Sequence, residues 1–292
     1  MNREAVPAAV ELDQALLRQW PLPSAEASQS KEDRGRVLVI AGASTIPGAC
    51  LLAGIAALRA GAGKLQVAVV APAAMHIAVR LPEAKVMSMP VDDAGEMQAL
   101  PDAVLRAAAG SDAVVFGPGM AAGPAMVLAL AQLFEQVDAP IVLDAGALDA
   151  YRGRSHPRAV LTPHPGEMAR MVGMPAEEVE ADAASFARRH ARDHGHVLVL
   201  KGSTTHIAAP DGRLWIHRGG SPGLGTSGSG DVLAGVVGGL LARGAYLEQA
   251  ACWAVSLHAQ AGRRLEQRHG SIGLLAREIA GEVPALMHSL RD

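Results

Sequence analysis

Residues 223–231, Gly-Leu-Gly-Thr-Ser-Gly-Ser-Gly-Asp, run directly into the apolar stretch Val232–Leu241. A segment with so many glycines cannot form a packed helix or a good strand. We therefore predict a loop that leads into a helix N-terminus. Free backbone N–H groups and the positive end of the helix dipole meet at such a place and favour a bound anion, usually phosphate. A carboxylate there would compete with that phosphate. We therefore interpret Asp231 as a base of ordinary pKa beside the phosphate, kept ionised by the helix end. The alternative is a helix-end aspartate without chemical function.

Strand and helix patterns alternate along the chain. Buried strands are predicted at 36–41, 65–70, 113–116, 140–144, 159–162 and 196–200, and a hairpin at 205–209 and 213–217. Helices are predicted at 49–60, 72–80, 101–109, 124–137, 176–194, 232–241, 246–266 and 274–290. This alternation is typical of an α/β fold with a mostly parallel sheet covered on both faces. Residues 1–34, with an amphipathic piece at Val10–Trp20, are interpreted as an N-terminal extension, and residues 35–292 as one domain.

Several chemically distinctive residues follow predicted strands. They are Gly117-Pro-Gly119, Asp144, His164 with Glu167, Lys201-Gly202 and the 223–231 loop. Ligands of open α/β sheets bind beyond the carboxyl ends of the strands, so these residues are expected to line one cleft. For His164 and Glu167 the alternative is a capped helix with Glu167 in its first turn, and Asp144 could equally be a turn residue.

The bulk composition excludes several classes of protein. A net charge of −3 gives no reason to expect nucleic acid or an anionic membrane as a partner. The uncharged run 113–131 contains Gly117-Pro-Gly119 and Gly123-Pro124, which argues against a membrane span. No signal peptide is visible at the N-terminus, so a cytoplasmic location is expected.

Cys50 and Cys252 are interpreted as buried, reduced thiols, with a disulfide or a reactive thiol as the alternative.

Two nucleotide-binding motifs and a metal cluster are not supported by the sequence. Gly223–Gly228 matches G-x-G-x-x-G, but it follows a hairpin late in the chain and precedes helices, which is the wrong context for a dinucleotide-binding fingerprint. No G-x-x-x-x-G-K-[ST] occurs, which excludes a Walker A loop. The histidines at 190, 194 and 196 adjoin several arginines, so a solvated helix face is favoured over a metal cluster.

The chain resembles the ADP-dependent NAD(P)H-hydrate dehydratase family of the ribokinase-like superfamily, from Gly35 to about Leu290. The G-x-G-D element at 228–231 is shared by that whole superfamily. More specific to the dehydratases are Ile46-Pro-Gly-Ala49 and Thr162-Pro-His-Pro-Gly-Glu167. Further matching segments are 35–42, 61–64, 117–119, 200–202 and 228–235. The resemblance implies a three-layer α/β/α sandwich with a central, mostly parallel sheet and a small hairpin.

The resemblance also implies a reaction. ADP would phosphorylate the ring hydroxyl of (S)-NADHX or (S)-NADPHX, the hydrated nicotinamide cofactors. Phosphate would then leave, restoring NADH or NADPH and giving AMP and phosphate. ATP could replace ADP, and Mg²⁺ would offset the phosphate charge. A cytoplasmic homotetramer and a functional link to a separate NAD(P)HX epimerase are further expectations, because no epimerase domain precedes the catalytic one.

Residue roles follow from the same resemblance. Asp231 would be the catalytic base. The hydrated cofactor would be bound by Ala49, Gly119, His164 and Asp231. The nucleotide would be bound by Lys201, Gly202, Ser203, Thr204, Thr205 and Gly230. The N–H groups of Gly228, Ser229 and Gly230 would form the anion hole. Glu167 would orient Mg²⁺ through water.

The chain departs from the family pattern at three places. Ser229 stands where the family commonly has Thr, the residues before it differ from the usual Ala-Thr-Gly, and Gly146 replaces the second aspartate of Asp-Ala-Asp-Ala-Leu. Two other functions therefore stay open. One is a small-molecule kinase of the same superfamily, acting on a vitamin precursor or a sugar. The other is a catalytically silent nucleotide-binding protein.

Overall fold

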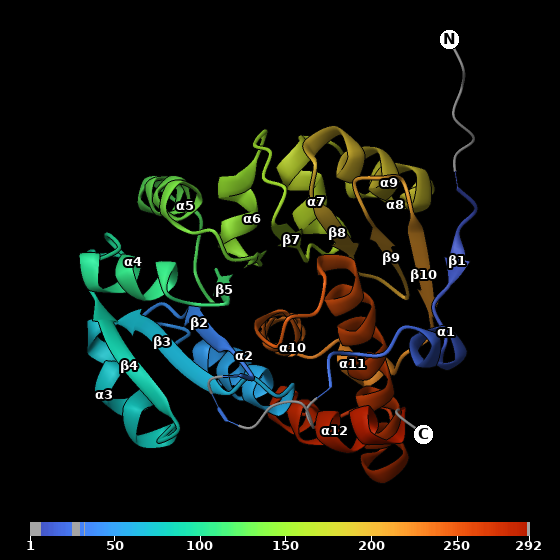
Figure 1. Cartoon of the computed structure of the whole chain (residues 1–292). Coiled ribbons are helices and arrows are strands. Elements are labelled where there is room, and N and C mark those ends of the chain that lie inside the picture. The colour runs from blue at the N-terminus through green and yellow to red at the C-terminus, as the bar shows by residue number, and fades with distance from the viewer. Residues whose placement is uncertain (1–6, 25–29, 32, 291–292) are drawn as a thin grey trace.

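The computed structural model describes residues 7–24, 30–31 and 33–290. Its strands form one sheet in the order β1-β10-β9-β8-β7-β6-β5-β2-β3-β4 (Figure 1). All neighbouring strands are parallel except that β9 runs antiparallel to β8 and to β10. The strands are β1 (Val10–Glu11), β2 (Arg36–Ile40), β3 (Lys64–Val70), β4 (Ala84–Met89), β5 (Ala113–Phe116), β6 (Ile141–Leu143), β7 (Ala159–Leu161), β8 (Val197–Leu200), β9 (Thr204–Ala208) and β10 (Leu214–Arg218).

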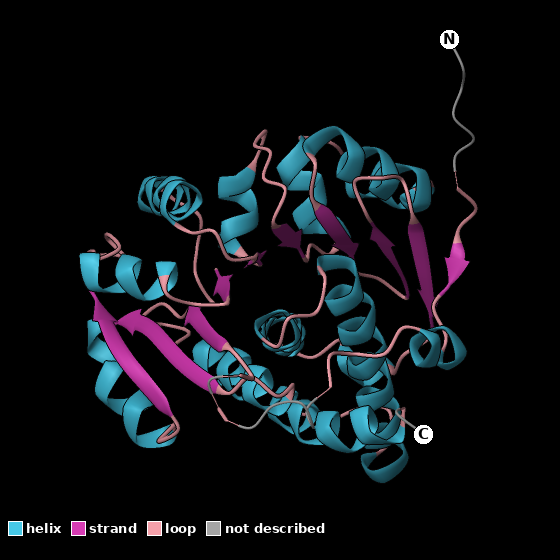
Figure 2. Cartoon of the chain, in the orientation of Figure 1, coloured by secondary structure: helices cyan, strands magenta, loops and turns pink. Residues whose placement is uncertain are grey.

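Helices cover both faces of the sheet, as Figure 2 shows. One face carries α1 (Gln14–Gln19), α2 (Gly48–Arg59), α3 (Ala71–Arg80), α10 (Ser229–Ala242), α11 (Leu247–His269) and α12 (Ala276–Ser289). The other carries α4 (Asp102–Ala109), α5 (Pro124–Gln136), α6 (Gly146–Tyr151), α7 (Pro165–Val172), α8 (Ala176–Ala181) and α9 (Ala183–His194). A short 3-10 turn, η1 (Pro222–Leu224), precedes α10. The predicted three-layer arrangement is confirmed.

The side chains of the central strands alternate between two separate cores. In β2, Val37 and Val39 pack under the α10 layer, while Leu38 and Ile40 pack under the α5 layer. Because successive strand residues point to opposite faces, a strand buried on both sides must be apolar throughout. The α10 helix lies at the centre of its layer, against α2, α11 and α12 (Figure 1). Its first turn is therefore held on several sides.

Three details differ from the sequence prediction. The helix expected at 176–194 is two helices, because the Asp182 side chain accepts the Ser185 N–H and starts α9 anew. A helix not anticipated, α6, begins after Ala145, whose φ is +47°. The solvated face proposed for the three histidines is wrong for His196, while His190 and His194 are half-buried. His196 is fully buried, and its ring lies 3.1 Å from the Tyr151 hydroxyl and 3.2 Å from the His190 ring, because α9 packs against the sheet.

Residues 7–24 lie against the rest of the molecule. β1 pairs with the sheet edge at β10, and the Trp20 ring stacks on Trp215 with centroids 5.7 Å apart. The Trp20 carbonyl accepts hydrogen bonds from Gln249 and from Trp253, both on α11. This segment therefore connects the outer edge of the sheet to α11.

Cys50 and Cys252 are buried free thiols, as predicted. Over the residues that the structure describes, no helix combines the length and the apolar character that a membrane crossing requires.

Candidate active site

The residues singled out from the sequence converge at one edge of the sheet. Asp144 directly follows β6, and Lys201 directly follows β8. Gly117–Gly119 follow β5, and the N-termini of α2, α7 and α10 face the same edge. This placement is the one expected for ligand sites in parallel α/β sheets.

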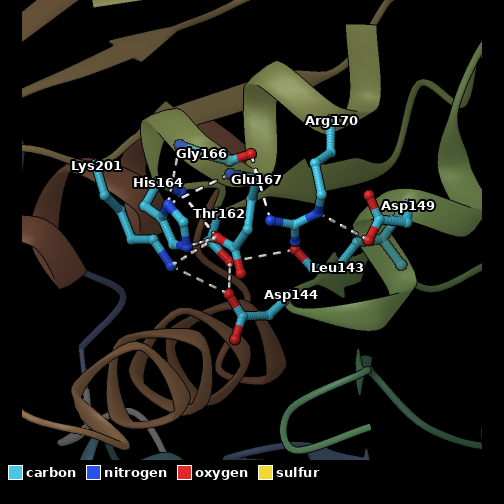
Figure 3. A network of polar contacts seen from close by, with 9 residues as sticks. All are labelled: Leu143, Asp144, Asp149, Thr162, His164, Gly166, Glu167, Arg170 and Lys201. Atoms are coloured by element: carbon cyan, nitrogen blue, oxygen red, sulfur yellow. Dashed lines mark hydrogen bonds and ion pairs between the residues drawn. The ribbon is translucent and has the colours of Figure 1, made fainter. Parts of the chain in front are cut away.

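Asp144 is buried at the centre of this cluster, with only 3% of its surface exposed. Its Oδ1 accepts a hydrogen bond from the Thr162 hydroxyl at 2.7 Å and lies 3.4 Å from Lys201 Nζ. Lys201 Nζ is also 3.7 Å from Glu167 Oε2 (Figure 3). Burial by itself lowers the pKa of Lys201, but Asp144 and Glu167 outweigh it and the pKa is raised. Asp144 thus belongs to a buried charge cluster at this edge of the sheet, and Lys201 stays charged between two carboxylates.

His164 and Glu167 form the capping box of α7. The His164 ring nitrogen Nδ1 accepts the N–H groups of Gly166 and Glu167, and Glu167 Oε2 accepts the His164 N–H at 2.8 Å. The helix-cap interpretation is therefore correct, and the same cap places His164 in the wall of a cavity and Glu167 beside Lys201. The His164 side chain is 53% exposed and that of Glu167 only 11%.

The glycine-rich loop leads into α10 as predicted. Gly228 is its N-cap, with φ +87° and no side-chain cap, so the first N–H groups of the helix are not consumed by a capping side chain. The Ser229 N–H, however, donates to the Thr226 carbonyl at 3.2 Å. Among the described residues the N–H groups of Gly228 and Gly230 have no acceptor. Of the three amides expected to bind an anion, these two are the ones left available.

Asp231 does not have the ordinary pKa expected from the sequence. Its pKa is raised to about 7, first by burial, then by the neighbouring Asp144 carboxylate and by Glu167, with Lys201 opposing the rise. The helix dipole alone suggested an ionised group. That expectation failed because the sequence does not reveal that α2 and α10 bury this carboxyl beside two others.

A cavity of about 680 Å³ opens on one side of the cluster. It contains most of the residues predicted to bind the nucleotide, namely Lys201, Gly202, Ser203, Thr205 and Gly230; Thr204 is not part of its lining. Its apolar wall comes from Leu224, Leu233, Val255 and Ala259. Neither this wall nor His217 and His258 beside it could be predicted from the sequence, because α11 and β10 have the residue patterns of ordinary core elements.

Ala49 and Gly119 meet at the N-terminus of α2. Gly119 has φ +64°, and a Cβ there would come within 2.3 Å of the Ala49 Cβ, so only glycine fits. The Ala43 N–H donates to the Gly119 carbonyl at 2.9 Å, which joins this loop to the end of β2. Neither residue lines the large cavity.

No group of three or more histidine, cysteine, aspartate or glutamate side chains suited to a metal ion occurs among the described residues. Glu167 and Asp144 nevertheless offer hard oxygen donors beside the cavity. Mg²⁺ in phosphate sites is commonly held by one or two carboxylates, water and the phosphates themselves. The residues present therefore fit such an ion.

Sequence comparisons place the chain among known proteins. The family described as NAD(P)H-hydrate dehydratase matches residues 37–285. The ADP-dependent (S)-NAD(P)H-hydrate dehydratase of Xanthomonas campestris is 46% identical over 280 residues, covering 94% of this chain and 95% of that protein. The protein of the same name from Bacillus subtilis is 35% identical, covering 90% and 92%. The chain spans 52% of the bifunctional NAD(P)H-hydrate repair enzyme of Moorella thermoacetica, at 38% identity.

Solved structures agree with the sequence comparisons. The ADP/ATP-dependent NAD(P)H-hydrate dehydratase of Bacillus subtilis, co-crystallized with ATP/Mg²⁺, superposes with a TM-score of 0.82 at 31% identity, covering 97% of this chain and 99% of that one. A ribokinase-like superfamily protein of Enterococcus faecalis gives 0.84 at 24% identity, covering 99% of each. Ribokinase of Arabidopsis thaliana gives 0.59 at 11% identity, covering 87% of this chain and 98% of that one. The last two support the fold alone, and the predicted ribokinase-like fold is confirmed.

Proposed function

The chain belongs to the NAD(P)H-hydrate dehydratase family, and we propose that it dehydrates (S)-NADHX and (S)-NADPHX to NADH and NADPH at the expense of ADP, giving AMP and phosphate. It is thus a carbon–oxygen lyase. The observation that carries this proposal is the placement of Asp231 beside the uncapped start of α10, next to a cavity large enough for a nucleotide.

The chemistry follows from this arrangement. Asp231 accepts the proton of the ring hydroxyl as that oxygen attacks the β-phosphorus of ADP, and AMP leaves. The N–H groups of Gly228 and Gly230 face the charge that develops on the transferred phosphoryl group. Phosphate then departs from the ring carbon, where hydroxide would leave poorly, and the adjacent ring carbon loses a proton to water, so that the ring double bond is restored. A base with a pKa of about 7 suits a proton transfer near neutral pH.

Lys201 and the two carboxylates around it complete the site. The Lys201 ammonium lies close to Gly230, where an added Cβ would be 3.2 Å from Nζ, so its charge is adjacent to the proposed anion hole. Glu167 and Asp144 would hold Mg²⁺, directly or through water, and this ion would offset phosphate charge when bound. Ala49, Gly119 and His164 would contact the hydrated cofactor; His164 also lines the large cavity, whereas Ala49 and Gly119 lie outside its lining.

Turnover of hydrated NADH with ADP and Mg²⁺ tests the proposal. The wild-type chain should restore NADH absorbance, and Asp231→Asn should lower kcat by about 10²- to 10⁴-fold, as expected for loss of a general base. Asp138→Asn is a matched control, because that carboxylate is fully exposed and pairs with Arg158. Absence of recovery with both ADP and ATP would reject the proposal. A stable phosphorylated product would instead indicate a small-molecule kinase.

Three further expectations belong to this proposal. ADP is the co-substrate and ATP can replace it, the chain assembles into a cytoplasmic homotetramer, and a separate epimerase supplies the (S) form of the hydrated cofactor. Competition between ADP and ATP and light scattering of the purified protein test the first two. Conversion of the (R) form only after an epimerase is added tests the third.

A further inference from the structure

Ser229, the first residue of α10, is held from outside its own helix. The Nε2 atom of His258, on α11, lies 3.0 Å from the Ser229 carbonyl oxygen and 3.0 Å from the Ser229 hydroxyl oxygen. With its N–H donated to Thr226, Ser229 is fixed through its amide, its carbonyl and its side chain. No other residue of the loop has comparable contacts in the described part of the chain.

These contacts determine the protonation of the imidazole. A carbonyl oxygen can only accept, so His258 Nε2 must carry a proton and donate it. The Ser229 hydroxyl oxygen, at the same distance from the same N–H, shares it as a second acceptor. Its own hydrogen then has no partner in this contact and is free to be donated. Ser229 lines the large cavity, so that direction is available.

The imidazole acts as a neutral donor throughout the physiological range. Burial lowers the pKa of His258 to about 4, the Ser229 carbonyl opposes this, and the Lys201 charge adds to the lowering. A neutral His258 leaves Lys201 as the cation next to Gly230.

The loop requires such an external anchor. Gly228 caps α10 in a left-handed conformation without a side-chain hydrogen bond, and its neighbours include several glycines. Glycine loses more conformational entropy on ordering than any other residue. The usual remedy, a Ser, Thr, Asp or Asn at the N-cap, would consume an N–H group that the anion needs. An anchor on α11 orders the turn and leaves those groups available.

We propose that His258 is a positioning residue. It holds Ser229 so that the Ser229 hydroxyl, together with the N–H groups of Gly228 and Gly230, donates to the phosphoryl group transferred from ADP. This inference rests on the proposed function.

A double-mutant cycle tests the role of His258. His258→Ala should lower kcat by about 10- to 100-fold, with a change of less than about threefold in KM for ADP, because the donor acts mainly on charge developed in the transition state. His258→Gln offers an amide N–H near the position of Nε2 and should recover most of that loss. In the Ser229→Ala background, His258→Ala should cost less than about threefold more, because the hydroxyl that His258 positions is already absent and only the carbonyl contact remains.

The controls separate positioning from folding. His269→Gln, an exposed substitution at the end of the same helix, should leave kcat unchanged. Thermal unfolding of every variant confirms that the folded protein is compared. Additive losses in the cycle, or no difference between His258→Ala and His258→Gln, would overturn the role of His258 while leaving the dehydratase intact. A wild-type chain without any turnover would overturn both.

Discussion

At the scale of the residue, the site depends on how charge is distributed around Asp231. Lys201 lies within 4 Å of two carboxylates and cannot neutralise three. The third, Asp231, therefore has its pKa raised to about 7 by burial and by its acidic neighbours. Like charges in one site commonly move the pKa values of neighbouring acid–base groups apart in this way.

The pH dependence of the reaction should report this carboxyl. Because the base must be ionised, kcat/KM should rise as the pH increases through about 7. Asp144→Asn removes the stronger of the two carboxylate contributions and should move this rise to lower pH. A pH profile of both proteins between pH 5 and 9 measures the effect. An unchanged midpoint in Asp144→Asn would contradict the assignment of the base.

The same shift has a consequence for stability. Asp231 has a higher pKa in the folded chain than its ordinary 3.8, so folding favours the protonated form. Its stabilising contribution is complete below pH 3.8 and is lost as the pH rises through about 7. At pH 8, Asp231→Asn should therefore increase the free energy of unfolding by about 1–2 kcal/mol although it lowers kcat. Urea unfolding at pH 5 and pH 8 checks this, since the gain should be smaller at pH 5.

The sequence predicted which residues lie close together, but not the pKa of Asp231 or the part played by His258. Asp144, His164, Lys201 and Asp231 could be assigned to one cleft because each follows a strand or opens a helix, and parallel strands end at one edge. The raised pKa of Asp231 depends on its burial and on the Asp144 and Glu167 carboxylates, which come from distant parts of the chain. His258 gave no signal, because one histidine in an apolar helix has the same pattern as a core residue.

At the scale of the element, the α2–α10 pair sets the position of the catalytic turn. Gly235 and Gly239 lie one turn apart on α10, where added Cβ atoms would come within 2.2 Å of the Ala53 carbonyl oxygen and 2.3 Å of the Ala57 carbonyl oxygen. The two backbones are therefore in contact, and small residues on both helices permit it. The sequence predicted two helices here, from the alanine-rich stretch 49–60 and the apolar run 232–241. It did not predict that the two helices pack on each other.

Gly239→Ala should separate these helices. The added methyl group meets backbone on α2 and cannot be relieved by a rotamer change, so we expect a loss of about 2–4 kcal/mol in the free energy of unfolding. Gly281→Ala on α12 is the matched control, because no atom of the residues that the structure describes lies within 4 Å of its Cβ position. There the higher helix propensity of alanine should stabilise the protein by about 0.5–1 kcal/mol. Chemical denaturation measures both, and equal effects would contradict the close packing of α2 and α10.

At the scale of the whole molecule, residues 7–24 join parts that contribute to the nucleotide cavity. His217 of β10 lines that cavity, as do Val255, His258 and Ala259 of α11. The N-terminal segment touches both elements, through the β1–β10 pairing and through the Trp20 carbonyl. The division of residues 1–34 from the rest of the chain stays a prediction.

Trp20→Ala should loosen the wall of the nucleotide cavity as well as the fold. The substitution removes the stacking on Trp215 and the packing that holds the Trp20 carbonyl toward Trp253, so about 2–3 kcal/mol of stability should be lost. Trp20→Phe keeps a stacked ring and should retain most of that stability. Tyr246 is 74% exposed next to the start of α11, so Tyr246→Ala should cost less than about 0.5 kcal/mol of stability. Because β10 and α11 both border the cavity, Trp20→Ala should also weaken ADP binding by about two- to tenfold, measured by calorimetric titration under conditions where the protein is folded. Unchanged ADP affinity together with the expected stability loss would show that the N-terminal segment supports the fold without influencing the site.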